Sequence, residues 1–123
     1  MMHHLPYDRS ARVADTVYQL VAELVTRDLT DPRLSGLSVT RVRMTKDLRI
    51  ARIYYHLLPT SEEAKEHAAR GVASAAPYIR RCITERLQLK FAPEIEFFYD
   101  ETVDIEERID ELMAGMNKGA ANV

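Results

Sequence analysis

The sequence predicts a single α+β domain in which helices cover one face of a three-stranded mixed sheet. Three observations lead to this prediction. Segments with helical periodicity and segments with a period of two follow one another in the order α-β-β-α-α-β-α. The strand segments alternate apolar and polar residues, as expected of a sheet with one packed and one open face. The last strand follows a pair of helices, and a crossover of this kind makes it parallel to one strand of the hairpin.

The N-terminal part contains an arm and an amphipathic helix. Residues 1–9 lack periodicity and are expected to form a flexible arm. Ser10 is the expected N-cap of the helix, and Asp31-Pro32 ends it, because the residue before a proline disfavours the helical conformation. The apolar stripe of this helix consists of Val13, Val17, Leu20, Val21, Leu24 and Val25.

Two strands that alternate with a period of two come next, at residues 37–45 and 50–58. The segment between them is short enough for a hairpin turn, so the strands are expected to pair antiparallel. The first strand is expected to place Thr40, Val42 and Met44 on one side and Val39, Arg41 and Arg43 on the other. The second is expected to place Ala51, Ile53, Tyr55 and Leu57 opposite Arg52, Tyr54 and His56.

Two helices are expected before the last strand. The first covers residues 62–75 and opens with a capping box, in which Thr60 is the cap and Glu63 reaches back. Pro77 lacks the N–H that an interior helical position needs. The chain is therefore expected to break at Ala75-Ala76-Pro77 and to begin a second helix there. The apolar side of that second helix holds Ile79, Ile83 and Leu87.

The C-terminal part is predicted to hold a strand and a short acidic helix. After Pro93, the strand alternates Ile95, Phe97 and Tyr99 with Glu96 and Phe98. Asp104 is the expected N-cap of the helix, whose apolar face holds Ile105, Ile109, Leu112 and Met113. Gly115 and Gly119 mark an expected frayed tail. We therefore divide the chain into the arm at 1–9, a folded domain at 10–100, and the acidic helix with its tail at 101–123.

Positive and negative residues are separated along the chain, although the net charge is only −2. Residues 1–93 hold fifteen Lys and Arg against ten Asp and Glu, a net charge of +5. Residues 94–123 hold two against nine, a net charge of −7. Because a polyanion responds to the local potential, the basic body is a candidate nucleic-acid-binding surface.

Several function classes find no support in the sequence. Cys82 is the only cysteine, which excludes an intramolecular disulfide and fits a reducing cytosol. No apolar run reaches the length of a membrane span, and a secretory signal is not recognisable. The sequence lacks a metal-ligand cluster and the common phosphate-binding and nucleophile motifs. We predict a cytoplasmic protein that is not an enzyme, needs no cofactor, binds no membrane and is monomeric when free.

Four segments carry a resemblance to a known family. They are Arg12-Val13-Ala14-Asp15 in the first helix, Asp31-Pro32-Arg33 after it, Thr45-Lys46-Asp47-Leu48 in the hairpin, and residues 93–101 through the last strand. In this order and at these separations, they make the chain resemble ribosome-binding factor A, the bacterial assembly factor of the small ribosomal subunit. The resemblance extends roughly from Arg9 to Leu112.

The resemblance implies a type II KH domain, whose element order agrees with the order derived above. KH domains bind single-stranded nucleic acid beside a GXXG loop between two helices. The family replaces this loop with a kink, commonly Ala-x-Gly, and the matching residues here are Ala75-Ala76-Pro77, with proline in place of glycine. The resemblance also implies binding to the immature small (30S) subunit, beside neighbouring ribosomal proteins, with a role in 16S rRNA maturation and in growth in the cold.

The residues expected to bind RNA lie at the kink and in loops. Arg80 and Arg81 fall in the first turn of the expected second helix, whose dipole also favours phosphate, and Tyr78 lies beside them. Pairing of Arg81 with Glu85 on a solvated face is the alternative. The further candidates are Arg70, Arg86 and Lys90 of the two helices and Arg33, Lys46 and Arg49 of the loops.

The leading hypothesis is a non-catalytic ribosome biogenesis factor that binds small-subunit rRNA through the basic face around the kink. The open sheet face offers a second place for bases to stack, with Arg41, Arg43, Arg52, Tyr54 and His56, but an outward face must be polar in any case. An alternative from another class is a protein-interaction module, in which the acidic C-terminal helix docks a partner and the chain binds no RNA directly.

Overall fold

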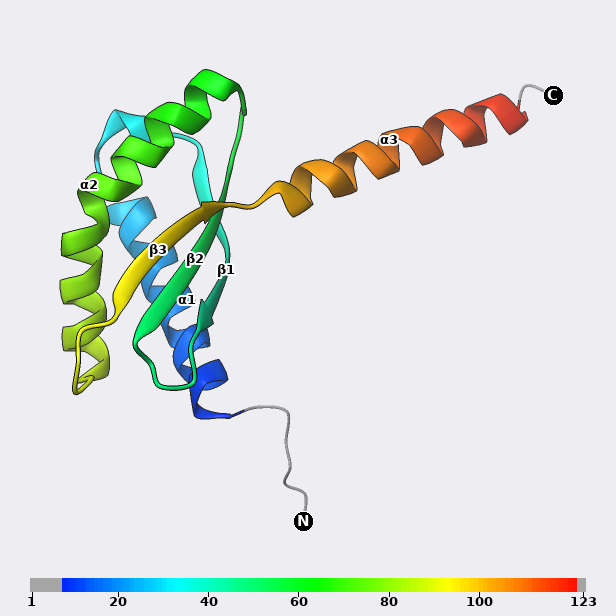
Figure 1. Ribbon diagram of the computed structural model, residues 1–123. Helices are drawn as coiled ribbons and strands as arrows, with labels where there is room; N and C mark the ends of the chain where they lie inside the picture. Colours follow the sequence, from blue (N-terminus) through cyan, green and yellow to red (C-terminus); the bar gives the residue numbers. More distant parts are fainter. Residues whose placement is uncertain (1–7, 122–123) are drawn as a thin grey trace, which may run out of the picture.

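The structure, a computed structural model, describes residues 8–121 and confirms the α+β class with a three-stranded mixed sheet (Figure 1). Its elements are α1 (Arg9–Arg27), the 3-10 helix η1 (Pro32–Leu34), β1 (Leu37–Met44), β2 (Ile50–Leu57), α2 (Glu62–Leu87), β3 (Glu94–Tyr99) and α3 (Glu101–Ala121). The strand order is β1-β2-β3. As predicted, β1 pairs antiparallel with β2, and β3 pairs parallel with β2. Residues 1–7 of the predicted arm lie outside the described residues.

The cap of α1 differs from the prediction. Asp8, not Ser10, is the N-cap, and its carboxylate accepts a hydrogen bond from the backbone N–H of Ala11 at 3.0 Å. The hydroxyl of Ser10 donates to the same carboxylate at 2.7 Å. Because Ser and Asp both cap helices well, periodicity alone did not separate the two positions. The helix therefore includes Arg9, which was assigned to the arm.

The predicted break at Ala75-Ala76-Pro77 is wrong, because α2 continues through Pro77 as one helix of 26 residues. Its N-cap is Ser61, which accepts from the backbone N–H of Ala64, and not Thr60. A proline inside a helix costs about 3 kcal/mol, because one backbone hydrogen bond is lost and the ring crowds the preceding turn. Buried side chains on both sides of Pro77 offset this cost. Figure 1 shows the result, a helix that changes direction part-way along its length.

The alternation of β1 is interrupted by an irregularity. The register between β1 and β2 shifts between Val39 and Arg41, so that Thr40 is an extra residue. Val39 is therefore buried in the core together with the half-buried Val42 and Met44, whereas the simple alternation placed it beside Arg41. The alternation predicted for β2 is confirmed, with one addition. His56 is also buried, at 8% exposure, by contacts from the chain that follows β3.

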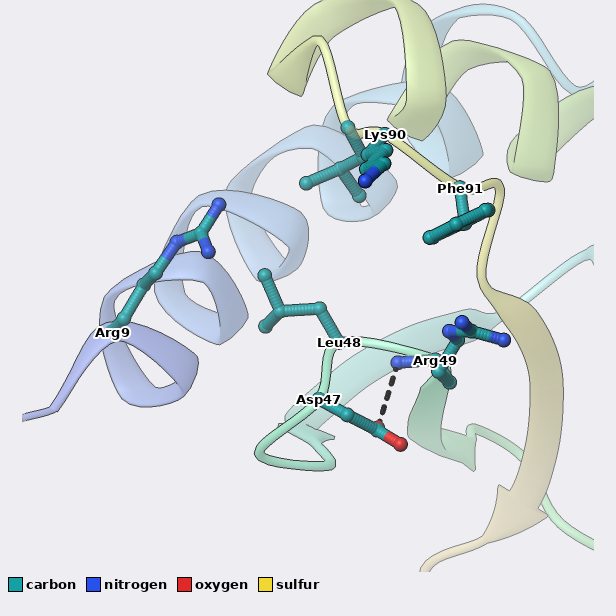
Figure 2. Close-up of a pocket in the computed structure, with 7 residues that line it drawn as sticks. Arg9, Asp47, Leu48, Arg49, Lys90 and Phe91 are labelled. Atoms are coloured by element: carbon teal, nitrogen blue, oxygen red, sulfur yellow. Dashed lines mark hydrogen bonds between the residues drawn. The ribbon is translucent and has the colours of Figure 1, made fainter.

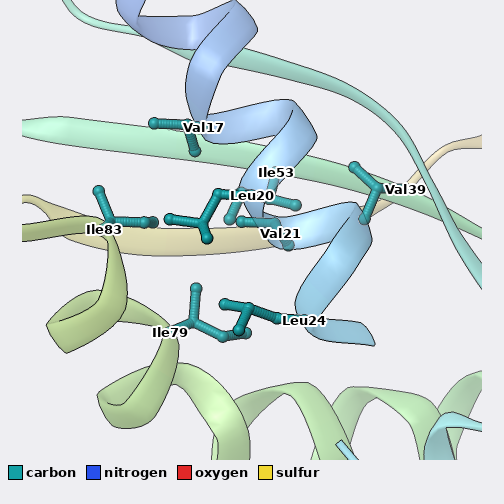
Figure 3. Packing of buried hydrophobic residues seen from close by; sticks show 8 residues of the cluster. All are labelled: Val17, Leu20, Val21, Leu24, Val39, Ile53, Ile79 and Ile83. Carbon is teal, nitrogen blue, oxygen red and sulfur yellow. The ribbon is translucent and has the colours of Figure 1, made fainter. Parts of the chain in front are cut away.

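Figure 3 shows the main core, which lies between the sheet and the helices α1 and α2. Its buried residues are Val17, Leu20, Val21, Leu24, Val39, Ile53, Ile79 and Ile83. A second cluster joins η1, β2 and the first half of α2, and consists of Leu34, Tyr55, Leu57, Ala68 and Val72. The predicted stripes of α1 and α2 thus cover one face of the sheet, and the opposite face remains open.

The C-terminal helix α3 begins at Glu101, so the predicted start at Asp104 is wrong. The backbone N–H of Thr102 donates to Asp100 at 3.0 Å, which gives Asp100 the capping role. The helix continues to Ala121, past Gly115 and Gly119, where a frayed tail was expected, and extends away from the rest of the molecule in Figure 1. Within residues 8–121, no helix has the length and hydropathy needed to cross a lipid bilayer.

Candidate nucleic-acid interface

The residues predicted to form a kink lie inside α2. Ala75 packs against the main core and Ala76 is half-buried, so both contribute little exposed surface. Pro77 is exposed at the rim of an open hollow of about 340 Å³. The hollow is lined by Pro77, Arg80, Arg81, Thr84, Glu85 and Ala92. The bend therefore places cations beside a shallow depression on a helix, and not beside a loop that wraps around a phosphate.

Arg80 holds the segment between α2 and β3. Its Nε donates to the carbonyl oxygen of Pro93 at 2.9 Å, and its Nη2 donates to that of Ala92 at 3.1 Å. The carboxylate of Glu94 lies 3.8 Å from the same Nη2. A guanidinium has five N–H groups, so Arg80 keeps some donors for an external anion. Its main effect in this structure is to fix the loop that carries Lys90 and Phe91.

Tyr78 joins α2 to the end of α1. Its hydroxyl donates to the carboxylate of Asp28, the C-cap of α1, at 3.1 Å. The guanidinium of Arg81 lies 5.8 Å from the centre of the Tyr78 ring, within the range of a cation–π contact. Among the described residues, Arg81 does not form the alternative ion pair with Glu85. The exposed Arg81 is therefore the cation at the bend that is most available to an anion.

We expect Tyr78 to ionise at unusually high pH. Hydrogen bonds with Cys82 and with Asp28 raise the pKa of Tyr78 from 10.0 to about 12. A raised phenol pKa means that the contribution of Tyr78 to folding is complete below pH 10.0 and is lost as the pH rises toward about 12. The measurement is the ultraviolet absorbance of tyrosinate in the unchanged protein minus that of Tyr78→Phe. A difference curve centred near pH 10 would contradict the hydrogen bonds with Cys82 and Asp28 as the cause of the raised pKa.

Three cations from separate parts of the chain line one open hollow (Figure 2), at the end of the molecule that holds the start of α1 and the β1–β2 turn (Figure 1). Arg9 comes from the start of α1, Arg49 from the β1–β2 turn, and Lys90 from the loop after α2. Together with Phe91 we call them the basic end cluster. They line a hollow of about 280 Å³, which also contacts Asp47, Leu48 and Leu89. The fold thus gathers two of the predicted RNA-binding residues, Arg49 and Lys90.

Phe91 gives the basic end cluster an aromatic surface. Its side chain is 50% exposed, although it is one of the largest apolar residues in the chain. The guanidinium of Arg49 lies 4.2 Å from the ring centre, and the ammonium of Lys90 lies 5.5 Å from it. Cation–π contacts of this kind hold flexible side chains beside the ring. A ring that can stack on a base, flanked by cations that can bind phosphate, is the usual combination for single-stranded nucleic acid.

The turn that carries Arg49 is fastened by Asp47. The carboxylate of Asp47 accepts from the backbone N–H of Arg49 at 3.1 Å (Figure 2). It also accepts from the hydroxyl of Thr45 at 2.8 Å. These bonds, the one from Thr45 being the stronger influence, lower the pKa of Asp47. Asp47 is therefore ionised at neutral pH, and its charge is used inside the turn. Lys46 of the same turn is exposed.

Lys46 also adds positive charge near the start of α1. The pKa of Asp8 is lowered first by the hydrogen bond from Ser10, then by that from the backbone of Ala11, and to a smaller extent by the charge of Lys46. Lys46 directly precedes Asp47, which lines the hollow, and so extends the basic end cluster along the turn. This brings a third predicted residue to the same end of the molecule.

The remaining predicted cations lie apart from this cluster. Arg33 is engaged by Asp31, with Nε and Nη2 at 3.0 and 2.6 Å from one carboxylate oxygen, Oδ2. Arg70 and Arg86 are exposed on α2, and neither forms an ion pair with another described residue. Arg70 precedes Pro77 by two turns and so lies on the same side of the helix. Arg70 therefore extends the cationic surface at the bend, whereas Arg33 stabilises η1.

The open face of the sheet carries four of the five residues predicted for it, Arg41, Arg43, Arg52 and Tyr54, together with Phe98. The fifth, His56, is buried beside Asp104. Arg41 lies 4.1 Å from the centre of the Tyr54 ring and 3.6 Å from the carboxylate of Asp100. Arg52 pairs with Glu96 at 3.1 Å. Because two of the three cations already have carboxylate partners, this face has less free positive charge than the basic end cluster.

Two residues of the basic end cluster were missed in the sequence. Arg9 was assigned to a flexible arm, and only the position of the α1 cap places it on the helix. Phe91 was not among the residues predicted to bind RNA. The available signal was an aromatic residue that follows Lys90 directly in a loop, where a large apolar side chain has no core to enter. The meeting of three segments at one end depends on the tertiary fold.

Comparison with known proteins agrees with this architecture. The family profile described as ribosome-binding factor A matches residues 9–113. Ribosome-binding factor A of Geobacter sulfurreducens is 41% identical over 107 residues, which cover 87% of this chain and 90% of that protein. The crystal structure of ribosome-binding factor A from Thermus thermophilus is similar with a TM-score of 0.64 and 26% identity, over 73% of this chain and 93% of that one.

A further similar structure is a homology model of the Thermus thermophilus ribosome-binding factor A, fitted into a cryo-EM map of its complex with the 30S subunit. The TM-score is 0.58 and the identity 25%, over 72% of this chain and 91% of that one. These relatives are named as ribosome-binding factors. The profile match and the level of identity over most of both chains show that this chain belongs to the ribosome-binding factor A family.

Proposed function

We propose that this protein is a cytoplasmic ribosome biogenesis factor that binds the immature small subunit and assists maturation of its 16S rRNA without catalysing a covalent step. The observation that carries the proposal is the basic end cluster, in which Arg49 and Lys90 flank an exposed phenylalanine and Arg9 lines the same hollow. Family membership and the 30S complex of a similar protein support the same partner.

The proposed mechanism is a shift between two conformations of the rRNA. A protein that binds one conformation more tightly stabilises it by the difference between the two binding free energies, and needs no catalytic group. Phosphates bind to the cations of the basic end cluster and to Arg81 at the bend, while an unpaired base stacks on Phe91. An immature rRNA offers unpaired segments that the mature subunit buries, so such a site favours the immature state.

The test is sedimentation of the full chain with purified immature small subunits, mature small subunits and large subunits at low salt. We expect the protein to move with the immature particles, less with mature small subunits, and not with large subunits, since only the first expose the unpaired rRNA. Binding should weaken as salt rises, because phosphate contacts release counterions. A protein that stays at the top of every gradient would contradict the proposal.

A further inference from the structure

The apolar face of α3 is exposed from Ile105 to Met113. Its side chains are Ile105 (56% exposed), Ile109 (49%), Leu112 (63%) and Met113 (58%). The spacing of four and then three between the first three residues places them on one side of the helix. In α1 and α2 the same pattern is buried against the sheet. The stripe of α3 therefore has the form of a packing surface without a partner among the described residues of this chain.

The first turn of α3 is fixed to the sheet. One oxygen of Asp104 lies 3.0 Å from Nε2 of His56 on β2, and the other accepts from the hydroxyl of Tyr99 on β3 at 2.8 Å. The hydrogen bond with His56, followed by that from Tyr99, lowers the pKa of Asp104. Just before the helix, Asp100 accepts from the hydroxyl of Thr40 on β1 at 2.6 Å.

These bonds reach all three strands, so the body of the protein sets the direction in which α3 leaves it. Figure 1 shows the helix extending outward from this anchor, with the sheet at its base. An amphipathic helix that simply covered its own domain would lie along the sheet, as α1 does. The anchor instead holds the stripe away from the body, where another molecule can reach it.

The charges around the stripe limit what that molecule can be. Residues 101–115 hold six carboxylates and one arginine. Helical spacing places Glu106 and Asp110 along one border of the stripe and Glu101 and Glu111 toward the other. On the second border, an open hollow of about 350 Å³ is lined by Glu101, Asp104, Ile105, Arg108, Ile109 and Leu112. The surface is thus an apolar strip whose edges are mainly acidic, with Arg108 as the one cation on the second border.

An RNA phosphate backbone is repelled by these edges, and a second copy of α3 would bring two sets of carboxylates together. A protein surface with an apolar groove edged by Lys and Arg matches both the stripe and the charge. We propose that α3 is a docking helix for a basic protein of the immature small subunit. The inference rests on the proposed function, and it assigns RNA binding and protein binding to opposite parts of the chain.

The test uses a photoreactive residue, p-benzoylphenylalanine, placed in the full chain at one position at a time and irradiated with purified immature small subunits. The positions are Leu112 on the stripe, Lys90 in the basic end cluster, and Glu107 on the side of α3 opposite the stripe. None of the three side chains is buried, so the replacement does not disturb the core. Treatment of the products with ribonuclease or protease identifies the cross-linked partner.

We expect position 112 to give a cross-linked product that is sensitive to protease and resistant to ribonuclease. Position 90 is expected to give a cross-link to rRNA, and position 107 to give no cross-link to protein. A different outcome is that position 90 cross-links to rRNA while position 112 cross-links to rRNA, to a second copy of the chain or to nothing. In that case the docking proposal is wrong and the proposed function stands. Absence of products from both positions overturns the proposed function and, with it, docking on the subunit.

Discussion

The double variant Arg49→Glu/Lys90→Glu is expected to bind a single-stranded RNA oligonucleotide about tenfold or more weakly than the unchanged protein at low salt. Both side chains flank Phe91 and line the same hollow, so each reversal replaces an attraction to phosphate with a repulsion. The dependence of log K on log salt should also become shallower, by about 0.7 for each phosphate of a single strand that is no longer neutralised. Fluorescence anisotropy at several salt concentrations measures both quantities.

Arg108→Glu is the control for this variant. It makes the same kind of charge change on α3, away from the basic end cluster, at a position that the acidic surroundings keep from RNA. We expect its salt dependence to equal that of the unchanged protein. If Arg108→Glu weakens binding as much per charge as the double variant does, the affinity depends on total charge and the cluster is not the interface.

Ile53→Ala is expected to lower the free energy of unfolding by about 2–5 kcal/mol. Ile53 lies on the central strand β2, is 0% exposed, and belongs to the core that both long helices share with the sheet (Figure 3). Removing its side-chain atoms loses their burial and leaves a cavity that the rigid neighbours fill only in part. Urea unfolding followed by circular dichroism measures the change.

Ile105→Ala is the matched control, because it makes the same substitution at a position that is 56% exposed on α3. The expected change in the free energy of unfolding is within about 0.5 kcal/mol, as for most surface substitutions. Equal losses from the two variants would mean that α3 packs on the body in solution. The comparison therefore also tests the exposure on which the docking proposal depends.

The fold could be predicted to a large extent from local patterns. In the stripe of α1 and the alternation of β2, apolar residues occupy the positions that face the core. Those positions recur along the chain with the period of the helix or the strand. The mixed sheet followed from the long connection before β3. These features are set by residues close in sequence, so they remain visible without the structure.

The candidate site could be predicted only in part. Lys46, Arg49 and Lys90 were selected because cations in loops and helix ends often bind phosphate, and the structure brings them to one end of the molecule. Their roles in RNA binding remain a prediction. The preference for Arg80 was based on the start of a second helix, which does not exist, and its guanidinium holds the loop before β3 instead. The contact between Arg80 and Pro93 joins two residues that are far apart in sequence, so no local pattern reveals it.

The break at Pro77 shows the limit of local rules most clearly. A proline penalty of about 3 kcal/mol is large for an isolated helix, but Ile79 and Ile83 are each buried in the core and can offset it. The same reasoning applies to Asp104, a good N-cap by type that bonds with His56 and Tyr99 once β2 and β3 are side by side. In both places, contacts between distant residues exceed the local preference.

Periodicity and charge along the chain were enough to predict the α+β class, the order of its helices and strands except for the division of α2 into two helices, and the separation into a basic body and an acidic end. Three-dimensional packing was needed to show that α2 is one bent helix, that Arg9 and Phe91 join Arg49 and Lys90, and that α3 is anchored at its base with its stripe exposed. The physical reason is that the period of a segment and its local charge are determined by residues that are close in sequence. The position of a cation, a cap or an apolar face depends on neighbours in space.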